Sequence, residues 1–294
     1  TMTGQQNSSK TDAGREASNS ERQVERKNSW VTVKGGPVIA VIDMGTNSFH
    51  MIVCQASPDK DHFEVLAKVK EAVPFFRRSL TAHYIDEPAM RAAARILRDM
   101  SKKAKERGAS TIVAVATSAV RESKNGEECL RRIRQELKID ARMVSGKEEA
   151  RLIYVGAAHS LPASKEKRMV VDIGGGSTEF IIGKRHDPQL MESLYMGCVS
   201  YTLRYFPDGK IDKKRLREAQ VAAAKEIQSI AHDYRRHGWR EAVGSSGTAR
   251  AIADLLEMNN LNPGGVTGLT AEGLQRLQTL LVKAGSVQGL GLAG

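Results

Sequence analysis

Two stretches of the chain combine an acidic residue, a glycine turn and hydroxyl side chains in the same order. In one of them an apolar run ends at Asp172, Gly174 to Gly176 and Ser177 form a turn, and a second apolar run follows. Glycine allows successive backbone N–H groups to point into one small space, and such nests bind phosphate. A carboxylate at the end of the incoming strand supplies a hard oxygen that suits Mg²⁺. The stretch therefore predicts a β-hairpin that binds phosphate.

The same order occurs 129 positions earlier, where an apolar run ends at Asp43 and Gly45 opens the turn. The polar residues of this turn are Thr46, Asn47 and Ser48. Two unrelated tight turns would explain either hairpin alone. The identical placement of the aspartate, at about the spacing of one small domain, instead indicates a duplicated fold with one cleft between the copies.

The length of 294 residues favours two domains, and a hydrophobic content of 40% allows substantial cores. We expect a disordered polar tail at residues 1–34, a first domain at 35–160 and a second at 161–294. No apolar run reaches the roughly 18 residues of a membrane helix, so we expect no membrane insertion. Cys54, Cys129 and Cys198 lack metal-binding spacing and suggest reduced thiols in the cytoplasm. A nucleophilic role for Cys198 is the alternative to a packing role.

The net charge is +11, of which +9 remains once the tail is set aside. Such a charge suggests a polyanionic partner: nucleic acid, an acidic membrane surface or a polyphosphate. The alternative is charge that serves solubility alone. The candidate contacts are Lys210, Lys213, Lys214, Arg215 and Arg217.

The hydrophobic periodicity predicts the order β-β-β-α-β-α-β-α in the first half, which is a ribonuclease-H-like arrangement. The expected elements after the first hairpin are a strand at 61–69, a helix at 86–107, a strand at 111–116, a loop at 117–122, a helix at 126–137, a strand at 139–144 and a helix at 147–158. The order then begins again with the second hairpin, a strand at 190–196, a long helix at 213–237, a strand at 241–243, a helix from 248 or 249 and a helix at 271–283. Compared with the first copy, the second is expected to lack its final strand and helix. Gly247 lies in a third glycine turn, here at a predicted helix N-terminus, where phosphate is favoured; ordinary capping is the alternative.

The motifs taken together resemble the exopolyphosphatase / guanosine pentaphosphate phosphohydrolase family, within the actin, sugar-kinase and heat-shock-chaperone superfamily. The segments that carry the resemblance are the two hairpins, the loop around Arg121, SGKEEAR at 145–151, MGCVS at 196–200 and GSSGT at 244–248. The resemblance implies an α/β fold of two ribonuclease-H-like (actin-like ATPase) domains around a cleft. It also implies removal of the terminal phosphate from inorganic polyphosphate or from guanosine pentaphosphate.

By this resemblance the catalytic base is Glu149. Helical spacing also places Glu149 on one face with Leu152, Ile153 and Gly156, which we expect to point inward; a glutamate that only stabilises a helix N-terminus is the alternative. The resemblance implies that Asp172 and Glu179, with Asp43 opposite, hold Mg²⁺ or another divalent cation. The implied phosphate contacts are Gly174, Gly175, Gly176 and Ser177 on one wall, Thr46, Asn47 and Ser48 on the other, and Gly247. Arg121 is expected to clamp the terminal phosphate with two nitrogens; its alternative is a surface pair with Glu122.

The sequence departs from the family in one loop, because residues 76–80 lack the glycines that usually follow the third strand. The basic balance favours an exopolyphosphatase. The alternatives are a guanosine pentaphosphate 5′-phosphohydrolase and a non-catalytic sensor of polyphosphate or nucleotide, and a homodimer is compatible with the sequence. A sugar kinase would require a sugar-recognition site, which the sequence does not show.

Overall fold

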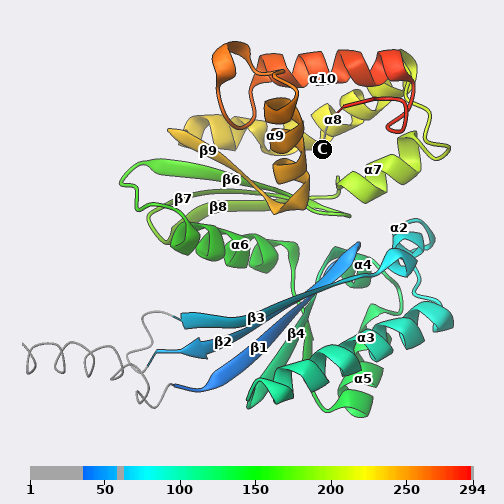
Figure 1. The fold of residues 1–294 in the computed structure, drawn as a ribbon, viewed down its shortest axis with the longest axis vertical. Coiled ribbons are helices and arrows are strands. Elements are labelled where there is room, and N and C mark those ends of the chain that lie inside the picture. Colours follow the sequence, from blue (N-terminus) through cyan, green and yellow to red (C-terminus); the bar gives the residue numbers. More distant parts are fainter. Residues whose placement is uncertain (1–35, 58–62, 293–294) are drawn as a thin grey trace, which may run out of the picture.

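The computed structural model describes residues 36–57 and 63–292, so the expected polar tail at 1–34 lies outside the described residues. Two β-sheets lie one above the other, and helices cover the outer side of each (Figure 1). Among the described residues the order of strands and α-helices is β-β-β-α-α-β-α-α-β-α and then β-β-β-α-α-β-α-α. The first half is thus the predicted order with two short helices added, at Arg77–Ala82 and Ser118–Arg121. This is the ribonuclease-H-like duplication of the actin-like ATPase fold.

Within residues 36–57 and 63–292, the first sheet has five strands in the order β3-β2-β1-β4-β5. Their bounds are β1 Val38–Met44, β2 Ser48–Ala56, β3 Phe63–Ala72, β4 Thr111–Ala116 and β5 Asp140–Met143. Strand β2 runs antiparallel to its neighbours β1 and β3, whereas β4 and β5 run parallel to β1. Alternation places Ala40, Ile42 and Met44 of β1 in the core. The other face of β1, with Val41 and Asp43, is open to solvent.

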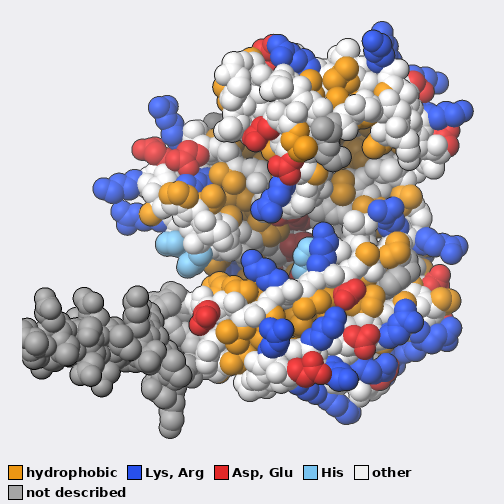
Figure 2. Space-filling view, viewed as in Figure 1, with side chains coloured by type: hydrophobic (Ala, Val, Ile, Leu, Met, Phe, Trp, Pro, Cys, Tyr) orange, Lys and Arg blue, Asp and Glu red, His pale blue; other side chains and the backbone are white. Residues whose placement is uncertain are grey.

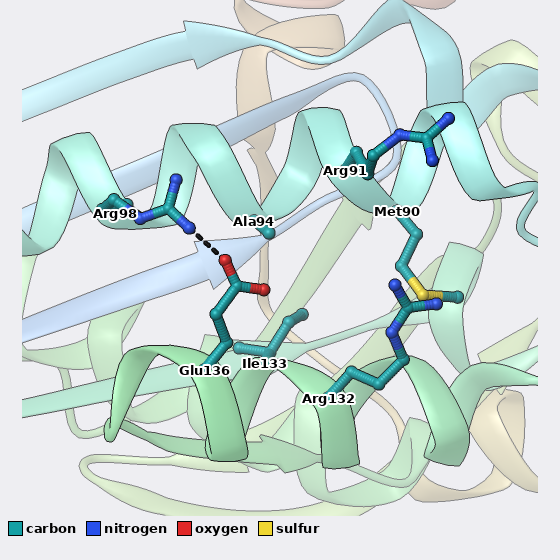
Figure 3. Close-up of a pocket in the computed structure, with 7 residues that line it drawn as sticks. All are labelled: Met90, Arg91, Ala94, Arg98, Arg132, Ile133 and Glu136. Atoms are coloured by element: carbon teal, nitrogen blue, oxygen red, sulfur yellow. Dashed lines mark hydrogen bonds and ion pairs between the residues drawn. The ribbon is translucent and has the colours of Figure 1, made fainter.

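Two amphipathic helices cover the core face of the first sheet, α3 (Glu87–Glu106) and α5 (Gly126–Leu137). Asp86 caps α3 by accepting a hydrogen bond of 2.8 Å from the Ala89 amide, and Pro88 stands in the first turn. Figure 3 shows the groove between these helices, where Arg98 pairs with Glu136. The residues that line this groove all belong to α3 and α5. These helices cover the face of the sheet opposite to the one that carries Asp43. We therefore interpret it as helix packing.

The second sheet has four strands among the described residues, in the order β8-β7-β6-β9. They are β6 Lys167–Ile173, β7 Thr178–Lys184, β8 Asp187–Leu194 and β9 Glu241–Ser245. Helix α6 (Gly146–Ser160) packs on one face of this sheet through Ala150, Tyr154 and Ala158. The long helix α8 (Lys213–His237) covers the other face through Ile230 and Tyr234. Helix α6 thus lies between the two sheets and is buried against the second (Figure 1).

The remaining elements lie around the cleft and at the top of the second half. They are η2 Pro74–Phe76, α2 Arg77–Ala82, α4 Ser118–Arg121, α7 Cys198–Tyr205, α9 Ser246–Met258, η3 Pro263–Gly265 and α10 Ala271–Ala284. No helix in the described part of the chain is long and apolar enough to span a membrane.

Two local expectations were wrong. Residues 118–121 form helix α4 where a loop was expected, because buried Ala119 and Val120 pack into the first core. Helix α9 begins at Ser246, two residues before the predicted start. The glycine-free stretch at 76–80, for which no element was predicted, is helical, and Phe76 packs on Phe49 with ring centroids 5.5 Å apart.

Candidate active site

The two predicted phosphate turns meet in the cleft. A Cβ atom added to Gly175 would lie 2.8 Å from the Cβ of Thr46, so only glycine allows the turns to approach this closely. Thr46 is 4% exposed as a result, which makes its hydroxyl part of the contact between the turns. Figure 2 shows a hollow between the two halves of the molecule with acidic side chains inside it. The sequence expectation that the two hairpins face one another is therefore met.

The start of helix α7 orients the glycine turn. The Cys198 amide donates to the Gly174 carbonyl at 2.9 Å, and the Val199 and Ser200 amides donate to the Gly175 carbonyl at 2.9 and 3.0 Å. In a trans peptide the C=O and the following N–H point in opposite directions. The amides of Gly175 and Gly176 must therefore point away from α7. Sequence reasoning used the 196–200 motif for the family resemblance and weighed a role for Cys198 alone, whereas in the structure the motif directs the donors of the nest.

Gly197 lies directly against this turn. A Cβ at Gly197 would stand 2.4 Å from the carbonyl carbon and oxygen of Gly175 and 2.5 Å from the nitrogen of Gly176. These are backbone atoms, which cannot move aside as a flexible side chain could. The glycine thus allows helix α7 to reach the turn, and only the structure reveals that requirement.

Asp172 and Glu179 are directly opposite one another on β6 and β7, so their side chains share one face at the mouth of the hairpin. The Ser193 hydroxyl donates to Glu179 Oε1 at 2.8 Å. Glu179 is 1% exposed, and Ser177 also hydrogen-bonds to it. Asp172 is less enclosed and hydrogen-bonds to Ser245 on β9. The hairpin therefore presents two neighbouring carboxylates, one accessible and one enclosed.

The carboxylates of the cleft have raised pKa values. Burial, with Glu149 and Asp172 nearby, raises the pKa of Glu179 to about 7. Asp43 is partly exposed, but protein atoms on its other sides remove much of its hydration. This desolvation, with the charges of Glu149 and Asp172, raises the pKa of Asp43 to about 7. Burial also raises the pKa of Asp172. The cleft thus gathers negative groups that repel one another, which is an environment suited to a cation.

The three predicted metal ligands do not form one cluster. In residues 36–57 and 63–292, no three His, Cys, Asp or Glu side chains lie close enough to share an ion. Asp43 belongs to the first sheet, and the Ser193 and Ser177 hydroxyls hydrogen-bond to Glu179 in the second. Mg²⁺ commonly uses one or two carboxylates together with water and substrate phosphate. Asp172 with its neighbour Glu179 fits that smaller donor set.

Arg121 and Glu149 are in direct contact. The Arg121 Nη1 atom donates to Glu149 Oε2 at 2.7 Å and to the Val144 carbonyl at 3.1 Å, and Nε lies 3.4 Å from Glu122. The side chains of Arg121 and Glu149 are 16% and 15% exposed. No acceptor in the described part of the chain is paired with Arg121 Nη2. Arg121 was expected to bind phosphate through two nitrogens. In this structure protein groups already engage Nη1 and Nε, so only Nη2 remains for a phosphate oxygen.

Glu149 reaches the cleft for a reason other than the predicted one. Leu152 is 42% exposed and Gly156 is also exposed, whereas Ile153 packs partly buried against the second core, so the expected inward face of α6 was only partly right. The buried face carries Ala150, Tyr154 and Ala158, and Glu149 stands at its margin, where its chain extends to Arg121. Burial raises the pKa of Glu149, while Arg121 opposes that shift. Glu148 instead pairs with Arg151 through two hydrogen bonds of 2.8 Å.

The other predicted phosphate contacts lie at the rim. Asn47 Oδ1 accepts from Nε and Nη2 of Arg77 at 3.1 and 2.9 Å, and Ser48 Oγ lies 2.6 Å from His50 Nε2. Gly247 is in the first turn of α9, two residues after Ser245. Ser245 is paired with Asp172 across the parallel strands β9 and β6. A Cβ there would meet nothing within 4 Å, so Gly247 is not required by packing.

Ser118 was not among the predicted site residues. The Ser118 hydroxyl is buried against Gly176 and has no hydrogen-bond partner among the described residues, which makes it a further candidate donor.

Arg215 of the predicted basic patch pairs with Asp208 and Asp212. Its charge is therefore already compensated within the protein.

The duplicated fold brings glycine turns and carboxylates together in one cleft, an arrangement suited to binding phosphate. The model of the Ppx/GppA phosphatase family matches residues 53–294, and the chain belongs to this family.

Solved structures of this family are similar to the chain. An exopolyphosphatase from Cytophaga hutchinsonii is 25% identical, with a TM-score of 0.73 over 83% of this chain and 80% of that one. The Ppx/GppA family member of Aquifex aeolicus is 25% identical, with a TM-score of 0.65 over 83% and 79%. An exopolyphosphatase-like protein is 26% identical, with a TM-score of 0.68 over 76% and 70%.

Proposed function

We propose that the chain is an exopolyphosphatase, which releases the terminal phosphate of inorganic polyphosphate by hydrolysis. The contact between Arg121 and Glu149 beside the oriented glycine turn carries this proposal. The net charge of +11 and the likeness to the Cytophaga hutchinsonii exopolyphosphatase support polyphosphate over guanosine pentaphosphate. Domains at 35–160 and 161–294 and a cytoplasmic location, suggested by three free cysteines, belong to the same proposal.

In the proposed reaction, water attacks the terminal phosphorus in line with the departing chain. Glu149 orients this water and accepts its proton. The Gly175 and Gly176 amides and Arg121 Nη2 hold the phosphate oxygens and stabilise the charge of the transition state. Asp172, with Glu179 beside it, would hold Mg²⁺, which when bound neutralises phosphate charge.

The test is the release of phosphate from long-chain polyphosphate and from guanosine pentaphosphate, measured at equal Mg²⁺ concentration. We expect a higher kcat/KM for polyphosphate. A higher kcat/KM for guanosine pentaphosphate would instead assign the nucleotide activity. Binding of either compound without turnover would indicate a sensor.

A further inference from the structure

A row of polar side chains crosses the open face of the first sheet, starting at the candidate active site. Asp43 on β1 is directly opposite His50 on β2, and His50 is directly opposite Lys70 on β3. Residues paired in this way project from the same face of a sheet. Neighbouring strands lie about 4.8 Å apart, so the row extends roughly 10 Å from Asp43 to the edge strand.

The far end of this row is cationic and lacks a counter-charge. His50 and Lys70 are both exposed, and no carboxylate within residues 36–57 and 63–292 forms an ion pair with Lys70. The adjacent Glu71 points to the other face, where it pairs with Lys103 of α3 at 3.4 Å. Partial enclosure by the protein, together with the charge of Lys70, lowers the pKa of His50. Lys70 therefore supplies the positive charge at this end of the row.

The surroundings of the row restrict the direction that a bound anion can take. On one side, Ser48 holds the His50 ring through its hydroxyl at 2.6 Å, next to the phosphate turn. On the other side, the next row begins with Val41 and Ile52, which are 41% and 40% exposed, and ends on β3 at the exposed Lys68, which is directly opposite Ile52. The apolar pair cannot replace the water around phosphate. A chain that leaves the active site therefore crosses β1 and β2 beside Asp43 and His50 and reaches the edge strand at Lys70, with Lys68 next to it on the same face.

We propose that His50 and Lys70 form a subsite for the phosphates that follow the terminal one in a linear polyphosphate. This inference rests on the proposed function, because it assumes that the terminal phosphate lies at the glycine turns. Lys70, on the edge strand, contacts phosphates that a short substrate does not reach. Lys70 thereby favours long chains over short ones.

The test measures binding to the Glu149→Gln protein, with long-chain polyphosphate and tripolyphosphate as the ligands, at several salt concentrations. Adding Lys70→Gln should weaken long-chain binding about fivefold. It should also reduce the slope of log K against log salt by about one, since one phosphate contact is lost. Tripolyphosphate binding should change less than twofold, and Lys70→Arg should restore the long-chain affinity.

The matched control is Lys102→Gln, which removes the same charge from an exposed position of α3 on the other side of the sheet. This control should leave affinity and salt slope unchanged. An unchanged slope in Lys70→Gln, or an equal effect of Lys102→Gln, would overturn the subsite. Absence of phosphate release by the unmodified chain would refute the proposed function, whereas the binding measurements would still decide the role of Lys70.

Discussion

Substitution of Gly197 by alanine should displace the glycine turn. The added methyl group would stand 2.4 Å from the Gly175 carbonyl and 2.5 Å from the Gly176 nitrogen. Ordinary contact begins near 3.4 Å, so the turn or the start of α7 must shift by about 1 Å. The φ angle of Gly197 is −122°, which alanine adopts readily. The predicted effect thus comes from the contact alone.

A shift of this size should affect turnover more than stability. Misplacement of catalytic groups by about 1 Å can lower the rate roughly 10²-fold. Overpacking at one position destabilises a protein by about 1–3 kcal/mol, which corresponds to a decrease in Tm of several degrees. We therefore expect Gly197→Ala to remain folded but to lose about 99% of its kcat/KM for phosphate release.

The assay combines phosphate release with thermal unfolding of the same preparations. The matched control is Gly156→Ala, an exposed position of α6 where a methyl group meets nothing within 4 Å. This control should keep its turnover and gain about 0.5–1 kcal/mol from higher helix propensity. If Gly197→Ala retains full turnover, the contact between α7 and the turn does not position the phosphate donors.

Three further outcomes are expected. Glu149→Gln should lower turnover by roughly 10²–10⁴ while polyphosphate binding survives; near-normal turnover in this folded variant would make Glu148 the next candidate base. Asp172→Asn should raise the Mg²⁺ concentration needed for half-maximal turnover, and an unchanged requirement would make Asp172 structural. Asp43 and Glu179 have pKa values of about 7, raised from 3.8 and 4.5, so the folded chain holds protons that the unfolded chain releases. Without Mg²⁺, the free energy of unfolding should therefore fall as pH rises from about 4 to 7, and Asp43→Asn should flatten the dependence of Tm on pH; an unaltered dependence would contradict these shifts.

The repeated hairpins were predictable because their signal is local. Alternating apolar residues define each strand, and a glycine turn follows an aspartate at the same position in both copies. The helix at 213–237 matched its prediction at both ends, since Asp212 caps its start and Gly238 follows its end. Elements with their own boundary residues can be located without knowledge of the fold.

Features that depend on contacts between distant segments were not predictable in the same way. The clearance at Gly197 depends on residues more than 20 positions away, and the enclosure of Glu179 depends on Ser193 of the next strand. The inward face assigned to α6 was only partly right for the same reason, since Ile153 packs against the core while Leu152 does not. Its periodicity does not reveal that the helix packs on the second sheet, with Leu152 left in solvent.

The ion pair between Arg121 and Glu149 joins two parts of the chain that are packed separately. Arg121 ends a helix in the core of the first half, while Glu149 belongs to a helix buried against the second sheet. If Glu149 is the base, its bond to Arg121 makes it a weaker proton acceptor in the absence of substrate. A phosphate that draws the guanidinium toward itself would release the carboxylate at the moment when a water is to be activated. Glu149 would then be a weak base without substrate, and binding of the phosphate itself would increase its basicity.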